Sequence, residues 1–402
     1  MECDLLIIGA GASGGTSAVS ALEGGVSDVV VVEKSPEKGG GVCKKIDFIK
    51  GIGINDTLKK LNLKPNYTSN TSRWYSPSNK CFTLKSEISD LWFTRGDFED
   101  SLDYRLQQLT LDKGANLLLN TELVEINGKN TAVVRENGKI KKIKAKVIID
   151  AEGVNSVIGK SLDLYSDKKY RRILGVGMVG WDFNIEAGIP EIFFDQENMP
   201  GSYCLLAKNP KDKLCYAVVG FECSDKLFNV KKIFENVLAK KPLIKSRLEE
   251  STFIENVFGE LYVAKPTQLV MDNIIITGDS ARLMEPFLHY GLREAIVSGY
   301  VAGIVSQKFL NQKKDANYLK KYSEEVERIL FPKLKRNGIY ERCFNNLCNS
   351  DIEKVFDFLI ENEGNLDNMS EKPYLYLHRL IPLLFKNPNF ILNVLKAIIR
   401  EK

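Results

Sequence analysis

A glycine turn near the N-terminus constrains the fold more than any other feature of this chain. The turn, Gly9–Gly14, follows the apolar run Cys3–Ile8 and precedes a small-residue helix at Thr16–Leu22. A second apolar run, Val29–Val32, comes next. At G-x-G-x-x-G spacing, the glycines permit a tight turn, close approach of the backbone to a pyrophosphate, and close packing of helix on strand. The pattern predicts a parallel βαβ unit that binds a dinucleotide.

An acidic residue completes this fingerprint. Glu33 ends the second apolar run, where a carboxylate accepts hydrogen bonds from ribose hydroxyls. The helix N-terminus offers N–H groups and a positive dipole end to the phosphates. A second G-x-G-x-x-G, Gly175–Gly180, lies inside a predicted strand with no helix after it, so we interpret it as coincidental.

Composition narrows the class of protein. The 402 residues are 44% hydrophobic and 27% charged, as in an ordinary globular protein. The net charge of +4, from 56 basic and 52 acidic residues, gives no indication of nucleic-acid binding. The eight cysteines form no C-x-x-C pair and only two histidines accompany them, so we expect no metal site. Cys343 and Cys348 are open to a disulfide or a free-thiol interpretation, and free thiols suit a reducing cytosol.

No segment of the sequence predicts export or membrane insertion. The chain enters a strand at once, which leaves no room for a signal peptide, and no apolar run is long enough to span a bilayer. We expect a cytoplasmic protein. The last stretch, Tyr374–Lys402, alternates apolar and basic residues. It is either an ordinary amphipathic helix pair or a peripheral membrane-docking segment.

The first half of the chain predicts further elements of the same sheet, interrupted by residues 46–94, which leave it. After the glycine-rich loop around Gly39–Gly41, residues 46–94 carry strands near 81–84 and 91–94. A helix capped by Asp97 runs to about Asp112 and ends at Gly114. The strands predicted next are 116–119, 122–127, 131–135, 139–143 and 147–150, with a hairpin turn at Asn137–Gly138.

The second half of the chain first predicts strands without intervening helices, and then a strand and helix that return to the first domain. Strands at 171–183, 190–195, 203–207 and 214–221, without helices between them, indicate an antiparallel sheet, and helices are expected at 229–239 and 242–250. A strand at 274–277 and a helix from Tyr290 to Leu310 follow. Residues 315–401 look helical, with breaks at Pro332, Pro373, Pro382 and Pro388.

We therefore predict an α/β (α+β) protein with a Rossmann-like cofactor domain, an inserted antiparallel-sheet substrate domain and a helical C-terminal region. The expected segments are 1–165 (first part of the cofactor domain, with the excursion 46–94), 166–265 (substrate domain), 266–312 (return segment) and 313–402 (helical region).

A second cofactor signal lies far along the chain. Gly278–Asp279 follows a strand and precedes small residues and a helix, which places a carboxylate beside ribitol or ribose hydroxyls. With these residues and the N-terminal fingerprint, the sequence resembles flavoproteins of the p-hydroxybenzoate hydroxylase fold, and among them the geranylgeranyl reductase family. The superfamily's Asp-Gly motif corresponds to Ile149–Ser156, with Glu152 where Asp is usual.

The resemblance covers roughly residues 1–310 and implies that the cofactor is FAD. Arg95 with Phe98 matches an element that lies near the flavin in the superfamily. The implied FAD-binding residues are Gly9, Gly11, Ala12, Ser13, Gly14, Glu33, Lys34, Cys43, Arg95, Val124, Glu152, Gly153, Gly278, Asp279, Gly291 and Leu292.

Three departures from the family bear on function. The family usually has glycine at Arg282, and a glycine pair around the turn beside the isoalloxazine ring, where this chain has His289-Tyr290-Gly291. His289 is either a residue near the flavin or an ordinary turn residue. Of the family's Tyr-x-Trp-x-Phe-Pro segment, which lines a lipid tunnel, only Tyr203 is retained.

The resemblance implies reduction of carbon–carbon double bonds in a geranylgeranyl chain, such as that of an archaeal-type membrane lipid, by hydride from flavin N5. Candidate proton donors are Tyr203, Cys43 and His289. No second Rossmann unit is present in the sequence, so electrons would come from a transient donor: NAD(P)H, a deazaflavin or a ferredoxin. Alternatives are an FAD monooxygenase acting on an apolar substrate, and a flavin-binding subunit without turnover.

Overall fold

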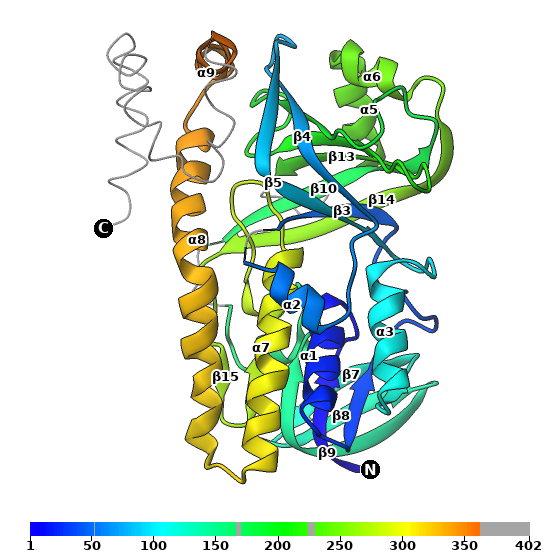
Figure 1. Cartoon of the computed structure of the whole chain (residues 1–402), viewed down its shortest axis with the longest axis vertical. Helices are drawn as coiled ribbons and strands as arrows, with labels where there is room; N and C mark the ends of the chain where they lie inside the picture. Colours follow the sequence, from blue (N-terminus) through cyan, green and yellow to red (C-terminus); the bar gives the residue numbers. More distant parts are fainter. Residues whose placement is uncertain (52, 166–169, 224–229, 362–402) are drawn as a thin grey trace. The chain divides into compact units, whose positions relative to one another are not determined.

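The computed structural model describes residues 1–51, 53–165, 170–223 and 230–361 (Figure 1). The predicted C-terminal helix pair at Tyr374–Lys402 and its proline breaks lie outside these residues. The described chain forms two compact units. Among the described residues, unit 1 comprises those within 1–65, 93–170 and 261–334, and unit 2 comprises those within 66–92, 171–260 and 335–361.

Unit 1 is an α/β unit whose elements come from three separate stretches of chain. Its strands are β1 (Glu2–Ile8), β2 (Val29–Val32), β3 (Lys45–Lys50), β6 (Asn116–Leu118), β7 (Thr121–Asn127), β8 (Thr131–Glu136), β9 (Lys139–Asp150), β15 (Val270–Met271) and β16 (Ile274–Ile276). Its helices are α1 (Ala12–Glu23), α2 (Asn55–Lys60), α3 (Leu102–Asp112), α4 (Val157–Ser161), α7 (Leu292–Asn311) and the 3₁₀ turns η1 (Gly278–Ala281) and η2 (Ala316–Lys320).

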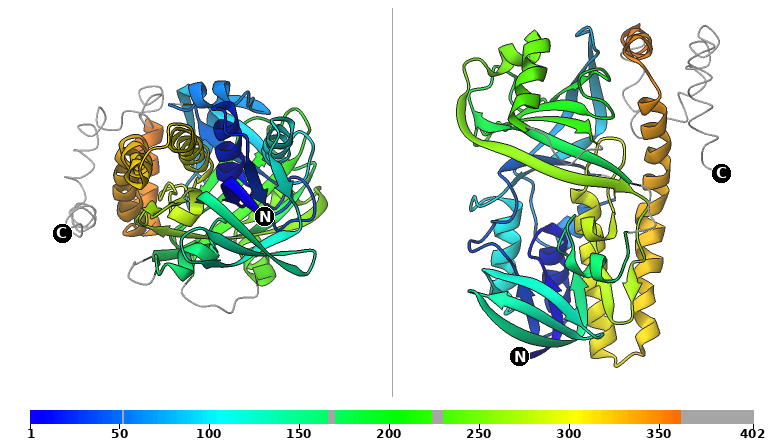
Figure 2. Two further views of the ribbon diagram at one scale, coloured as in Figure 1. Left: turned by 90° about the horizontal axis from the view of Figure 1, so that it is seen from below. Right: turned by 180° about the vertical axis from the view of Figure 1, so that it is seen from behind.

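The central sheet of unit 1 has the strand order β15-β16-β9-β1-β2-β6. The pairs β16–β9, β9–β1, β1–β2 and β2–β6 are parallel, as the N-terminal βαβ pattern predicts. The β7–β8–β9 hairpins extend the sheet antiparallel, and residues 121–150 are drawn in teal in Figure 2. The four valines of β2 are buried, as expected for a strand covered on both faces.

Two helices cover this sheet through an unusually close contact. Helices α1 and α7 lie side by side (Figure 1). A Cβ at Gly299 of α7 would lie 2.2 Å from the carbonyl oxygen of Ser13, and one at Gly303 would lie 2.0 Å from Ser20 Oγ. The Ser17 hydroxyl donates to the Gly299 carbonyl at 3.0 Å. Small residues therefore bring the return segment against the N-terminal helix, and this contact ties the two distant parts of the cofactor domain together.

Unit 2 contains the antiparallel sheet predicted for the insertion. The strand order of this sheet is β14-β10-β13-β12-β11-β4-β5-β3, with β11 and β4 parallel; the edge strand β3 belongs to unit 1. The strands wholly in unit 2 are β4 (Tyr67–Tyr75), β11 (Glu191–Phe194), β12 (Tyr203–Lys208) and β13 (Cys215–Glu222), with helices α5 (Val230–Lys240), α6 (Pro242–Leu248) and α9 (Asn349–Glu361). The unit boundaries fall within β5 (Cys81–Arg95), β10 (Tyr170–Trp181), β14 (Thr252–Ala264) and α8 (Lys321–Asn345).

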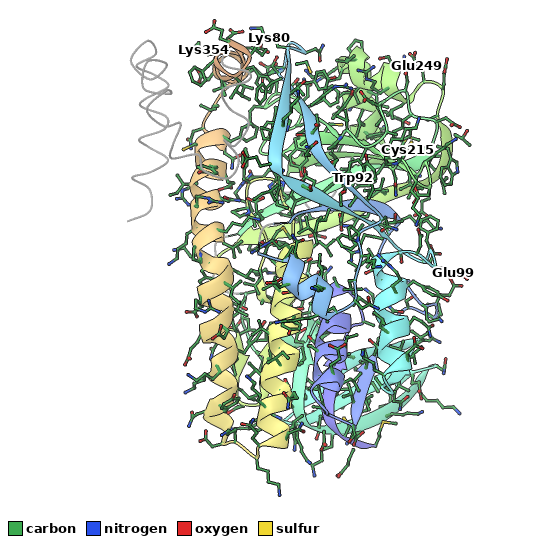
Figure 3. All side chains as sticks on the ribbon, in the orientation of Figure 1. Lys80, Trp92, Glu99, Cys215, Glu249 and Lys354 are labelled. Carbon is green, nitrogen blue, oxygen red and sulfur yellow. The ribbon has the colours of Figure 1, made fainter. Side chains whose placement is uncertain are left out.

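Helix α9 is fastened to the turn between β4 and β5. Glu353 accepts hydrogen bonds from the backbone N–H of Ser78 at 2.6 Å and from the Ser76 hydroxyl at 3.0 Å. Lys80 pairs with Glu353 at 3.4 Å, and Lys80 and Lys354 lie at the same end of unit 2 (Figure 3). On the sheet, the Phe194 ring contacts Phe344 and Phe356, with ring centroids 5.4 and 6.2 Å apart. The C-terminal helices therefore pack on an aromatic face of the sheet.

Several predicted boundaries are corrected. The N-cap of α3 is Ser101, whose hydroxyl accepts from the Tyr104 N–H, and not Asp97, because Gly96 at φ +100° forms a turn that delays the helix. Helix α8 continues through Pro332, which is exposed, while Tyr322, Val326 and Leu330 are buried on the opposite face and hold the helix together.

Other differences concern strand length. The strands predicted at 81–84 and 91–94 are one strand, β5, and those at 139–143 and 147–150 are one strand, β9. β4 and the long strand β14 were not predicted. The hairpin turn is confirmed, since Asn137 and Gly138 both have the positive φ of a type I′ turn. The second glycine motif lies inside β10. A Cβ at Gly177 would be 1.8 Å from the carbonyl oxygen of Ala217 on the paired strand β13, so this glycine serves strand packing.

Candidate functional site

The carboxyl ends of four strands of unit 1 meet in register. Ile8 of β1 is level with Val32 of β2 and with Asp150 of β9, and Asp150 is level with Ile276 of β16. The segments that leave these strand ends are therefore neighbours. They are the glycine turn 9–14, Glu33, the second segment 150–156 and the third segment 278–282. The crevice outside the carboxyl ends of such a sheet is where its ligands bind.

The glycine turn has the backbone that the fingerprint predicts. Gly9 has φ +95°, and a Cβ there would lie 2.4 Å from the carbonyl oxygen of Ala151. A Cβ at Gly14 would lie 1.9 Å from the carbonyl oxygen of Gly9. At Gly11, in contrast, no atom lies within 4 Å of the Cβ position. Two glycines thus serve packing, and the third faces open space.

The N-terminus of α1 is available to an anion. Gly11 is the N-cap, no side chain caps the helix, and no acidic residue lies in its first turn. The first N–H groups of a helix have no partner within the helix, and the helix dipole is positive at this end. This end of α1, which includes Ala12 and Ser13, is thus suited to a phosphate group.

Glu33 joins the turn to the loop that follows β2. Its side chain is buried, and its two oxygens accept hydrogen bonds from the backbone N–H groups of Ala10 at 2.8 Å and Ser35 at 2.9 Å. A carboxylate has about four lone-pair positions, so each oxygen can accept a further hydroxyl. A Cβ at Gly41 would lie 2.9 Å from Glu33 Oε1, which explains the glycine-rich loop beside it.

Gln107 is a site residue that the sequence did not single out. Its side-chain oxygen accepts from the Gly39 N–H at 2.9 Å and its amide nitrogen donates to the Ala10 carbonyl at 3.2 Å. One buried side chain of α3 thus connects the turn with the glycine-rich loop. The signal was present in the sequence: Asp103, Gln107 and Thr110 are polar and repeat at the helical period on the buried side of α3.

Replacing Glu33 with glutamine is expected to weaken binding of a ribose-containing ligand about 10-fold. The NH₂ group of the glutamine would face one of the two backbone N–H donors, and two donors cannot form a hydrogen bond with each other. Titration of the apoprotein with FAD, followed by quenching of flavin fluorescence, measures this change. Glu122→Gln, on an exposed carboxylate of β7, is the matched control. Equal affinities for the two variants would remove Glu33 from the site.

The second segment contains two neighbouring carboxyl groups, the buried Asp150 and the half-buried Glu152. The Ser156 hydroxyl lies 2.6 Å from Asp150 Oδ2 and 3.1 Å from Glu152 Oε1. The same Glu152 oxygen accepts from the N–H groups of Val157 and Ile158, so it caps α4. Burial raises the pKa of Asp150 to about 6. Burial and the neighbouring Asp150 raise the pKa of Glu152 to about 7. The glutamate in the place of the usual aspartate therefore supports the local backbone.

This pair predicts a pH dependence of stability. Both folded-state pKa values lie above the ordinary values of about 4, so the folded state binds more protons than the unfolded state as pH rises from about 4 to 7. Their contribution to the free energy of unfolding is thus present at low pH and is lost through that window. Denaturant unfolding at several pH values measures this fall in the free energy of unfolding. In Glu152→Gln the fall should be smaller than in wild type by on the order of 1–3 kcal/mol. Parallel pH profiles for wild type and variant would contradict the prediction.

Asp279 is the acid of the third segment, and it is half-buried. Its Oδ1 is buried and has no hydrogen-bond partner among the described residues, and it lies 3.0 Å from the Cβ position of Gly291, the N-cap of α7. Burial raises the pKa of the Asp279 carboxyl, and the positive charges of Lys45, Arg95 and Arg282 act in the opposite direction. A buried acceptor without a donor points to a group that is bound there in the functional protein.

Arg95 is held in an ion-pair network. Its Nε and Nη2 donate to the two oxygens of Asp103 at 2.7 and 2.8 Å, and its Nη1 donates to Asp47 at 2.5 Å. Lys45 lies 3.3 Å from the same Asp47 oxygen. Arg95 is thus fixed by α3 and β3 and contributes to the site at least through its charge on Asp279.

The turn before α7 carries His289. Glu285 is buried, and its carboxylate accepts from the N–H groups of Phe287 and Leu288 at 2.9 and 2.7 Å. His289 has φ +57° and Arg282 has φ +58°. The resemblance implies glycine at both positions. The left-handed backbone explains this preference, because glycine adopts it without strain.

The remaining predicted residues have varied environments. In unit 1, Lys34 is exposed, Cys43 is a half-buried free thiol, Val124 lies at a bulge of β7, and Gly153 has φ +83°. Leu292 is buried at the start of α7. Tyr203 lies in unit 2 on β12, where its ring is 6.3 Å from that of Phe194. Cys343 and Cys348 are both free thiols.

These features fit FAD: an uncapped helix and an open Gly11 for the diphosphate, Glu33 for the ribose, and the unpartnered Asp279 oxygen for a ribityl hydroxyl. The description of the matching family model is FAD binding domain, and it covers residues 2–331. The chain belongs to this family. It is an FAD-dependent oxidoreductase, and its predicted α/β fold class and its resemblance to geranylgeranyl reductases are confirmed.

Relatives and solved structures span nearly the whole chain. Digeranylgeranylglycerophospholipid reductase 2 of Methanopyrus kandleri is 24% identical, over 89% of this chain and 91% of that protein. The structure of a geranylgeranyl bacteriochlorophyll reductase-like protein of Thermoplasma acidophilum has a TM-score of 0.77 at 21% identity, covering 89% and 91%. The p-nitrophenol 4-monooxygenase of Pseudomonas putida has a TM-score of 0.70 at 12% identity, covering 92% and 96%.

Two kinds of feature are absent from the described residues. No helix among residues 1–51, 53–165, 170–223 and 230–361 has the length and hydropathy that crossing a bilayer requires. In the same residues, no group of three or more histidine, cysteine and acidic side chains is arranged to bind a metal ion.

Proposed function

We propose that this FAD-dependent oxidoreductase reduces carbon–carbon double bonds in the geranylgeranyl chains of an ether-type membrane lipid. The observation that carries the proposal is the similarity to a named digeranylgeranylglycerophospholipid reductase along about nine-tenths of both chains, together with the match to the FAD binding domain over residues 2–331. FAD supplies the hydride when bound, and the protein supplies orientation and a dry surrounding.

The residues of unit 1 hold the cofactor. Gly11 and the N-terminus of α1 bind the diphosphate, Glu33 the adenosine ribose, and Asp279 the ribityl chain. Burial raises the pKa of the Asp279 carboxyl, and the positive charges of Lys45, Arg95 and Arg282 offset part of that rise.

Unit 2 offers surroundings that suit an apolar chain. Trp74, Phe194 and Tyr203 form a continuous aromatic group on neighbouring strands, with ring centroids 5.4 and 6.3 Å apart. An isoprenoid has no hydrogen-bonding groups along its length, so it binds through buried apolar area. Phe194 and Tyr203 are buried within the unit, so we assign substrate contact to Trp74, the half-buried member of this group.

Reduction of an alkene also needs a proton for the second carbon. Cys43, His289 and Tyr203 are the candidates. Cys43→Ser, His289→Gly and Tyr203→Phe each remove or weaken one donor. The variant that loses product formation while it keeps bound FAD identifies the donor, and retention of product formation by all three would assign the proton to solvent.

The function is tested by incubating dithionite-reduced protein with a digeranylgeranylglycerol phospholipid in the absence of oxygen. We expect each reduced double bond to add two hydrogens, seen by mass spectrometry, and the flavin to become oxidised in step. No mass gain would contradict the proposal. An oxygen-dependent gain of one oxygen atom would instead support a monooxygenase, and a flavin that responds to neither substrate nor oxygen would support a non-catalytic role.

A further inference from the structure

Arg282 is a bulky residue in a backbone conformation that costs it free energy. Its φ of +58° is in the left-handed region, where side chains other than glycine are rare, and it directly follows η1. Such an outlier persists where its side chain makes contacts that hold it. Arg282 is 8% exposed, so its charged side chain is almost completely removed from water. Burial of an arginine requires partners for its guanidinium.

Those partners come from three separate elements of unit 1. The guanidinium carbon lies 4.0 Å from the ring centroid of Tyr165 and 4.6 Å from that of Tyr262. Its Nη1 donates to the Val154 carbonyl at 3.0 Å. An arginine placed over aromatic faces and out of water gains more from the cation–π contact than an exposed one. The side chain thus links the third segment to the second segment and to β14.

Neighbouring contacts reinforce the same link. The Ser280 hydroxyl accepts from the Gly153 N–H at 2.9 Å and donates to the Gly153 carbonyl at 3.1 Å. The Tyr165 hydroxyl donates to the Ser280 carbonyl at 2.8 Å. A Cβ at Gly159 would lie 2.0 Å from the Tyr165 hydroxyl oxygen, so α4 is shaped to receive this ring. The Ser280 contacts with Gly153 connect 150–156 with 278–282, and Tyr165 connects 278–282 with α4.

We infer that Arg282 is a positioning residue for FAD: its guanidinium, held between Tyr165 and Tyr262 and bonded to Val154, fixes the second and third segments in the geometry that presents Asp279 to the cofactor. The backbone of η1 passes this restraint on, because the Arg282 N–H donates to the carbonyl of Asp279 itself at 3.1 Å. Its positive charge also acts on the Asp279 carboxyl. The inference depends on FAD binding alone, so failure of the lipid-reductase proposal would leave it standing.

Arg282→Gly is a clean test, since glycine tolerates φ +58° and the variant removes only the side chain. Lys160→Ala, which removes an exposed cation of α4, is the matched control. Apoprotein of each variant is titrated with FAD, and the visible circular dichroism of the bound flavin is recorded. We expect the FAD dissociation constant of Arg282→Gly to rise about 10-fold or more, with altered flavin dichroism, and that of Lys160→Ala to stay near wild type.

Two further variants separate positioning from folding. Arg282→Lys keeps a donor and a charge and should recover part of the lost affinity. Tyr262→Leu removes one ring and leaves Arg282 in place, and should weaken FAD binding several-fold even if Arg282→Gly does not fold. The inference is overturned if FAD affinity and flavin dichroism match wild type in Arg282→Gly or, failing that, in Tyr262→Leu. A lower melting temperature of the apoprotein with unchanged FAD affinity would also overturn it, since Arg282 would then be a structural residue only.

Discussion

Asp279→Ala is expected to purify without flavin, as colourless protein, and to bind added FAD at least 10-fold more weakly than wild type. The physical reason is the buried Oδ1, which has no donor among the residues that the structure describes and which we assign to a ribityl hydroxyl. A hydrogen bond to a charged, buried acceptor is worth about 1.5–3 kcal/mol, or roughly a 10- to 150-fold change in dissociation constant. Flavin content per chain, read from visible absorbance of the purified protein, measures the effect.

The same variant should not destabilise the apoprotein. Removing a buried carboxylate with an unpartnered oxygen removes a desolvation cost, so the melting temperature of Asp279→Ala apoprotein should equal or exceed that of wild-type apoprotein. Asp272→Ala, which removes an exposed carboxylate paired with Lys129, is the control and should keep its flavin. A yellow Asp279→Ala protein, or a colourless one that has lost its fold, would speak against the assigned role.

The glycine turn gives the second large effect, in a pair of opposite variants. Gly14→Ala should lower the free energy of unfolding by about 3 kcal/mol, because its Cβ would lie 1.9 Å from the Gly9 carbonyl oxygen and backbone atoms cannot rotate away. Gly11→Ala should leave folding unchanged, since nothing lies within 4 Å of its Cβ position and its φ of −71° suits alanine. Urea denaturation of the two apoproteins measures this contrast.

FAD binding should respond differently in this pair. In Gly11→Ala the new methyl group occupies the open space that we assign to the diphosphate, so FAD affinity should fall at least 10-fold, about 1.4 kcal/mol, in a stably folded protein. If Gly11→Ala binds FAD like wild type, the diphosphate does not approach this part of the backbone. If Gly14→Ala is as stable as wild type, the tight packing of turn and helix is not present in solution.

The parts of the site that the sequence predicted are those set by local backbone rules. A βαβ unit aligns the ends of its parallel strands, so Gly9 and Glu33 had to lie at one edge. The hairpin at Asn137–Gly138 followed from turn chemistry, since both residues accept a positive φ. Asp279 could be assigned because the same kind of strand end recurs there, and the resemblance to known flavoproteins joined it to the glycine turn 9–14.

The parts that were missed depend on long-range contacts. Ser101 caps α3 in place of Asp97 because Gly96 forms a turn first, and Asp103 is drawn into the ion pair with Arg95. Pro332 stays within α8 because burial of the opposite face outweighs its missing hydrogen bond. Gln107 bonds to backbone groups of Ala10 and Gly39, which are distant in the sequence. The partners of Arg282 are distant from it in the sequence as well. No local pattern states which distant group such a side chain will meet.

The most direct test of the central claim is calorimetric titration of the wild-type apoprotein with FAD. The glycine turn, Glu33, the second segment and the third segment should together bind one FAD per chain. The affinity should fall when Glu33, Gly11 or Asp279 is changed singly. An apoprotein that is folded but binds no FAD, or that binds it equally well in all three variants, would contradict this account.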